Sequence, residues 1–168
     1  MWQFHWLTWI AAAVAALLIE TTLLPLVFPP GYVPDLVLVV VVAFALFETP
    51  MRGATLGAMA GLLVDLVAGR MWGMNLGVDA ALGAAVAVLQ TKIVRDAVFV
   101  PGLIGALAQV VAHLLDWVGA RVAQIDLSLG AFMRPTPIWI LFGLFLTPAL
   151  VVLLGLKPRH EVDARHRF

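Results

Sequence analysis

The residue best placed to do chemistry in this chain is Asp65, an acid inside a long apolar run. A carboxylate in hydrocarbon is costly, so an acid within a membrane is by default a functional-site hypothesis. Asp65 lies on a ladder of small residues spaced four apart, which form one helix ridge that another helix can approach closely. This ridge predicts a docking surface with a polar end, for a helix of this chain or of a partner. The ridge consists of Gly53, Gly57, Gly61, Asp65 and Gly69.

Further acidic and polar residues are expected to collect in the outer half of the membrane. Gln109, His113 and Asp116 are spaced four and three residues apart, so they share one face of a helix. Ionisable residues within a membrane usually face the bundle interior and pair with another group. We therefore expect a polar cavity that opens outward. Its candidate residues are Glu20, Asp79, Gln109, His113, Asp116 and Arg70.

Simpler structural roles account for several of these polar residues. Asp35 follows a proline and is placed to cap the helix after it. Asn75 is a natural N-cap, with Asp79 near the first turn, where the helix dipole favours an acid. Asp65 and Glu20 lie several residues from any loop. Only these two acids have no such structural explanation.

Catalytic chemistry has little support in the sequence. Ser128 is the only serine, and the chain carries no G-x-S-x-G elbow, H-E-x-x-H pair or Walker loop. His113 is more typical of a hydrogen-bonded interior histidine, because no second His or acid completes a metal-ligand spacing. The absence of cysteine removes thiolate ligands and nucleophiles. We predict a protein that is not an enzyme and holds no metal or cofactor.

The composition places these residues in a membrane. Hydrophobic residues make up 63% of the 168 positions and charged residues 12%, with a mean hydropathy of +1.05. A soluble domain carries about twice as much charge. The formal net charge is zero, so no basic field points to nucleic acid as a partner.

Six apolar blocks predict an all-α bundle of about six transmembrane helices. The first, fifth and sixth blocks reach the ~20 residues that a helix needs to cross ~30 Å of hydrocarbon. The other three are shorter; the second and third either cross fully or form a re-entrant hairpin. We favour crossing, because it gives the stronger charge asymmetry. The blocks are 6–28, 34–47, 53–68, 76–91, 99–118 and 138–156.

The distribution of Lys and Arg predicts that both termini are cytoplasmic. With six crossings, seven of the ten basic residues lie on the inner side and three on the outer side, as the positive-inside rule requires. Residues 1–156 then form a single transmembrane helical domain, and 157–168 form a basic cytoplasmic tail. The inner set is Arg52, Lys92, Arg95, Lys157, Arg159, Arg165 and Arg167, and the outer set is Arg70, Arg121 and Arg134.

The order of these motifs resembles the MreD family of rod shape-determining proteins. Asp65 matches the acid of that family's G-L-x-x-D-x-x-x-G core, and Gly73 with Asn75 matches the turn that follows. Glu20 and Asp79 depart from the family pattern in being more acidic. The resemblance is clearest between Glu20 and Asn75. Its motifs are L-L-P at 23–25, P-D-L at 34–36, the turn at 48–52, G-A-T-L-G-A-M-A-G-L-L-V-D at 53–65 and A-G-R-M-W-G-M-N at 68–75.

This resemblance implies a noncatalytic scaffold in the bacterial inner membrane that helps to control cell shape and lateral peptidoglycan synthesis. The implied direct partner is MreC, which has a single span. RodA, the penicillin-binding transpeptidase and MreB are implied partners through the rod complex, and membrane lipids surround the chain. In this interpretation the glycine ridge receives the span of MreC.

A second function follows from a further likeness. The MreD family is similar in architecture to the S-components of energy-coupling-factor vitamin transporters, which bind a small molecule in an outward cavity. A small-molecule or lipid binding protein is therefore the alternative. Its ligand would be cationic or polar and would lie among Glu20, Asp65, Asp79, His113 and Asp116.

Overall fold

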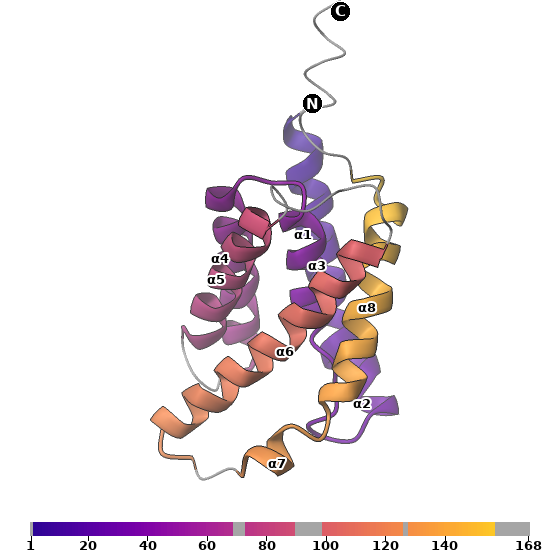
Figure 1. Ribbon diagram of the computed structural model, residues 1–168. Coiled ribbons are helices and arrows are strands. Elements are labelled where there is room, and N and C mark those ends of the chain that lie inside the picture. Colours follow the sequence, from indigo (N-terminus) through magenta and orange to yellow (C-terminus); the bar gives the residue numbers. More distant parts are fainter. Residues whose placement is uncertain (1, 69–72, 90–98, 126–127, 157–168) are drawn as a thin grey trace, which may run out of the picture.

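The structure is a bundle of helices (Figure 1). The computed structural model describes residues 2–68, 73–89, 99–125 and 128–156, and all regular structure in these ranges is helical. The elements are α1 Trp2–Leu18, the π-helical turn η1 Ile19–Leu23, α2 Leu24–Val27, α3 Leu36–Ala45, α4 Pro50–Ala68, α5 Met74–Leu89, α6 Phe99–Val122, α7 Leu129–Phe132 and α8 Thr136–Leu153.

Three helical stretches among the described residues are long and apolar enough to cross a membrane: Trp6–Val27, Phe99–Val122 and Leu129–Leu153. They correspond to the first, fifth and sixth apolar blocks of the sequence. The prediction of an all-α membrane protein with several short helices is confirmed. Helix α4 is longer than its apolar block and reaches 19 residues, because it begins at Pro50. Proline suits the first helical position, where its missing N–H is not needed.

Helix α3 forms the centre of the bundle, which explains why it is short and uniformly apolar. All ten of its residues are buried. Helices α1, α4, α5, α6 and α8 pack around it. A helix with no polar face needs apolar contacts on every side, and here other helices rather than lipid supply them.

Two pairs of helices lie on opposite sides of α3 (Figure 1). Helices α4 and α5 pack along their lengths, and so do α6 and α8. The second pair meets through small residues: a Cβ added to Gly105 would overlap the Thr147 hydroxyl and the Gly143 carbonyl. Close backbone contact of this kind is how helices associate where the hydrophobic effect does not act between them.

The two ends of the bundle differ in what they carry. Helix α1 begins and α8 ends at the top of Figure 1, whereas α7 and the connection from α2 to α3 lie at the bottom. We call the bottom end, with α7, the outer end, in keeping with the charge distribution. The start of α1 and the end of α8 therefore lie at the same end of the bundle, as the prediction of six crossings requires.

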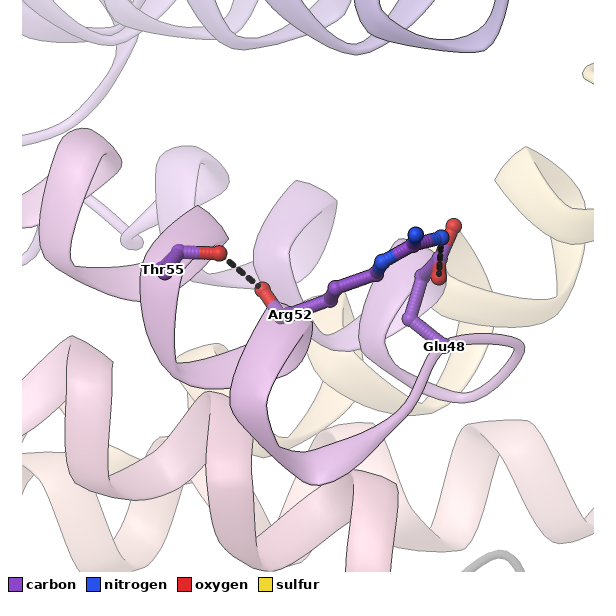
Figure 2. A network of polar contacts seen from close by, with 3 residues as sticks. All are labelled: Glu48, Arg52 and Thr55. Carbon is purple, nitrogen blue, oxygen red and sulfur yellow. Dashed lines mark hydrogen bonds and ion pairs between the residues drawn. The ribbon is translucent and has the colours of Figure 1, made fainter. Parts of the chain in front are cut away.

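The turn between α3 and α4 is held by local contacts (Figure 2). Arg52 Nη1 lies 3.5 Å from Glu48 Oε2, and the Thr55 hydroxyl donates to the Arg52 carbonyl at 2.9 Å. Both charged side chains are partly exposed, so this ion pair contributes little to stability. The pair joins Glu48 in this turn to Arg52 in the first turn of α4.

Candidate functional site

Asp65 lies near the outer end of α4 and is only 2% exposed. Its Oδ2 accepts hydrogen bonds from the backbone N–H of Gly73 at 3.0 Å and of Leu76 at 3.1 Å. Its Oδ1 accepts from the Asn75 side chain at 2.8 Å and from the Asn75 N–H at 3.3 Å. These are the donors that the start of α5 leaves without intrahelical partners. Asp65 therefore caps the helix that follows its own.

Two neighbouring residues adapt to this cap. Gly73 has a φ of +91°, a conformation that suits glycine, and it places its N–H on the Asp65 carboxylate. The sequence predicted Asn75 as the N-cap of this helix, and that prediction is wrong. Helix α5 begins one residue earlier, at Met74, and Asn75 instead supports Asp65 from within the first turn.

The glycine ridge of α4 is covered by α5. A Cβ added to Gly57 or Gly61 would overlap the backbone of α5, so these glycines allow the two helices to touch. The ridge therefore packs against a helix of the same chain. A partner helix cannot contact Gly53, Gly57 and Gly61 while α5 covers them. Gly69 lies outside the described residues. The facing pairs are Gly53 with Gly83, Gly57 with Asp79, and Gly61 with Asn75.

Glu20 has a similar role at the start of α3. Its Oε2 accepts from the backbone N–H of Leu36 at 3.0 Å and lies 3.4 Å from the N–H of Val37. Asp35 accepts from the Leu38 N–H at 2.7 Å, which confirms it as the N-cap of α3. Glu20 lies in the π-helical turn η1, where the changed helix pitch redirects side chains. Glu20 and Asp35 thus accept hydrogen bonds from the backbone N–H groups at the start of α3 that have no partner within the helix.

The inward face of α6 holds the outer part of the bundle together. Gln109 Nε2 donates to the Asp35 carbonyl at 2.7 Å, and His113 Nε2 lies 2.6 Å from the Phe132 carbonyl. The His113 ring stacks on Phe132 with centroids 4.3 Å apart and meets Trp139 edge-on at 4.0 Å. Gln109 and His113 therefore tie α6 to the connection before α3 and to α7.

Asp79, one of the acids predicted to line an outer cavity, is buried within the bundle. This residue is 3% exposed, and its carboxylate lies within electrostatic reach of four other acids. They are Glu20, Asp35, Asp65 and Asp116. Arg70, the cation assigned to the same group from the sequence, lies outside the described residues. The acids, Gln109 and His113 thus form one polar region in the outer half of the bundle.

The sequence reasoning missed two features. One is the pair of aromatic rings, Phe132 and Trp139, around His113. The other is a second small-residue ridge on the outside of α5, formed by Gly77, Ala81 and Ala85, all of which are exposed. A Cβ added to Gly77 would meet nothing within 4 Å. The four-residue spacing that revealed the ridge on α4 would also have revealed this one.

Comparison with known protein families relates most of the chain to one of them. The family model for the rod shape-determining protein MreD matches residues 2–156. No curated protein and no solved structure shows significant similarity to the chain, so the likeness to vitamin-transporter S-components stays a prediction.

Proposed function

Because the chain belongs to the MreD family of rod shape-determining membrane proteins, we propose that it is a noncatalytic scaffold that binds MreC. In this role it joins MreC to the cell-wall elongation complex, and through that complex to RodA, the penicillin-binding transpeptidase and MreB. The site supports a scaffold because Asp65 and Glu20, the acids that the sequence left without a structural role, both act as helix caps. Their carboxylates accept backbone N–H groups and organise the fold.

The inner membrane is the proposed location, with both termini in the cytoplasm. Seven basic residues on the inner side against three on the outer side support this orientation. The start of α1 and the end of α8 lie at the same end of the bundle, as this topology requires (Figure 1). Residues 157–168 then form a basic cytoplasmic tail.

The exposed ridge of α5 carries the docking proposal. Gly77, Ala81 and Ala85 repeat every four residues and so form a shallow stripe along one side of the helix. Helices in a membrane associate by close packing, and small residues at this spacing permit it. The single span of MreC is the proposed occupant. The sequence placed the docking surface on α4, but α5 covers those glycines. The proposed docking surface is therefore the exposed side of α5.

A contrast with α4 supports this choice. The exposed side of α4 presents large apolar residues that suit contact with lipid tails, including Met59, Leu62 and Leu66. The exposed side of α5 presents small residues from Gly77 to Ala85, and the large residues Val88 and Leu89 are exposed only at its end. A helix that packs closely against a shallow surface gains more dispersion attraction than lipid chains do, because this attraction falls steeply with distance.

Co-purification with MreC tests the docking surface. In the double variant Gly77→Leu with Ala81→Leu, recovery of MreC is expected to fall about tenfold or more, since two bulky side chains keep the partner backbone away. The fold is expected to survive, because the space around Gly77 is open. Rod shape should be lost when this variant replaces the wild-type chain.

A matched control separates docking from a general effect of bulk. Ala11 is an exposed small residue on α1, so Ala11→Leu adds the same side chain to a different lipid-facing helix. This control should retain MreC and rod shape. Recovery of MreC at the wild-type ratio with the double variant would show that MreC does not dock on α5.

A further inference from the structure

Helix α7 and the residues beside it, from Ser128 to Arg134, have few contacts with the rest of the bundle. Among the described residues no other helix packs along α7, and most of this segment is exposed. Its own hydrogen bonds close within the segment or reach the first turn of α8. A helix of four residues is too short to be stable by itself, so α7 persists only while contacts with the bundle stabilise it.

His113 on α6 supplies those contacts. Its Nε2 lies 2.6 Å from the Phe132 carbonyl oxygen, and its ring stacks on the Phe132 ring with centroids 4.3 Å apart. The carbonyl can only accept, so Nε2 carries a proton and donates it. Trp139 meets the same ring edge-on, but it belongs to α8, and its Nε1 donates to the Tyr32 carbonyl at 3.3 Å. One hydrogen bond and one ring stack therefore join α7 to α6.

The closed position of α7 leaves a polar atom of His113 unsatisfied. The side chain is only 3% exposed, and its Nδ1 has no hydrogen-bond partner among the described residues. With the proton on Nε2, Nδ1 is an unprotonated acceptor that would accept a hydrogen bond from water. Burial without that bond costs free energy, which offsets part of what the contacts with Phe132 contribute. The open position regains this bond, so the two positions differ little in free energy.

We propose that residues 128–134, which we call the strap, open and close over the outer half of α6, with His113 as the latch. In the closed state the strap covers the His113 ring. In the open state α7 unwinds and water from the outer side reaches Nδ1. Pro135 is buried at the start of α8, so the strap stays attached to the bundle at that end. The strap is independent of the docking of MreC, because its contacts are with α6 and α8 and not with the exposed ridge of α5.

Hydrogen exchange of the full-length chain in nanodiscs tests the strap. The N–H groups of Phe132 and Met133 donate to carbonyls within the strap, so they exchange when it opens. In the wild type we expect them to exchange at least about tenfold faster than the amides of residues 104–112 in α6. His113→Leu removes the hydrogen bond and the ring stack. It should speed exchange in the strap by about ten- to a hundredfold and leave residues 104–112 unchanged.

Two further variants show whether the effect belongs to the latch. Leu114→Ala truncates an exposed side chain beside His113 on the same helix and should leave exchange in the strap unchanged. His113→Phe keeps a ring for stacking but loses the donor, so its effect should lie between those of the wild type and His113→Leu. The proposal is overturned if His113→Leu leaves exchange in the strap unchanged, or if it speeds exchange equally throughout α6.

The reactivity of His113 gives a second measurement, in which the latch residue stays intact. Diethyl pyrocarbonate acylates an unprotonated imidazole nitrogen, and the strap shields Nδ1 from it. Phe132→Ala removes the covering ring and should speed acylation of His113 about tenfold. Peptide mapping separates this site from the other histidines, His5, His160 and His166. If His113→Leu does not fold, this measurement decides the result, and an unchanged rate of acylation means that the strap does not cover His113.

Discussion

The N-terminal ends of α3 and α5 are both capped by carboxylates, but the capping contacts differ in sequence separation and in the number of acids that make them. Each short helix receives an acid from a preceding helix, Glu20 for α3 and Asp65 for α5. Asp65 accepts four hydrogen bonds from residues 8 to 11 positions further along the chain. Glu20 reaches residues 16 and 17 positions away and shares the task with Asp35. The α5 cap is therefore local and carried by one residue, whereas the α3 cap is long-range and divided.

This difference explains which cap a sequence motif can encode. The glycine ridge, Asp65 and the turn to Asn75 form one continuous segment, and every contact of the cap lies inside it. The α3 cap depends on the π-helical turn η1 and on how α1 packs beside α3. The cap of α5 thus depends only on contacts within the segment from α4 to α5. The cap of α3 depends on the packing of α1 against α3.

The largest effect is expected from filling the contact between α4 and α5. Gly61→Leu places a side chain on the Asn75 backbone, beside the residues that Asp65 caps. We expect a loss of about 3 kcal/mol or more in the free energy of unfolding, because the clash is with backbone and not with a movable side chain. Reversible unfolding in mixed detergent micelles measures this loss. Gly77→Leu, on the open side of α5, is the matched control, and an equal loss in both variants would contradict the packing that we describe.

A smaller loss is expected when the local cap is removed. Asp65→Ala leaves the N–H groups of Gly73, Asn75 and Leu76 without their acceptor, at a cost of about 2 kcal/mol in the free energy of unfolding. Asn75→Ala removes only the side-chain donor and should cost less. If both variants unfold at the same denaturant concentration as the wild type, Asp65 does not stabilise the start of α5.

The smallest loss is expected at the divided cap. Glu20→Ala removes one strong hydrogen bond, to Leu36, and one weak one, while Asp35 continues to accept from Leu38. We expect a cost of about 1 kcal/mol in the same unfolding measurement. The double variant with Asp35→Ala should cost more than the sum of the single variants, because each acid partly compensates for the other. If Glu20→Ala lowers the free energy of unfolding more than Asp65→Ala does, the divided cap of α3 is the stronger of the two caps and our ranking is wrong.

Much of the fold could be predicted because hydrophobic length and turn chemistry act locally. The apolar blocks predicted the helices to within a few residues, and Asp35 was identified as a cap from its place after Pro34. The glycine ridge was also found, since its spacing alone defines a helix surface. The identity of the neighbour was not predictable from the spacing, because small residues suit a helix of the same chain and a partner helix equally well.

The sequence by itself determined a membrane bundle of helices, the polar residues of its outer half and the family to which the chain belongs. These features depend on composition and on spacing along the chain, which local physics can interpret. Only the tertiary structure decided the roles of Asp65 and Glu20. A carboxylate in hydrocarbon must find donors, and which donors are near depends on how the helices pack. The packing of α5 against α4 turned Asp65 into a cap, covered the glycines of α4 and left the small residues Gly77, Ala81 and Ala85 of α5 exposed.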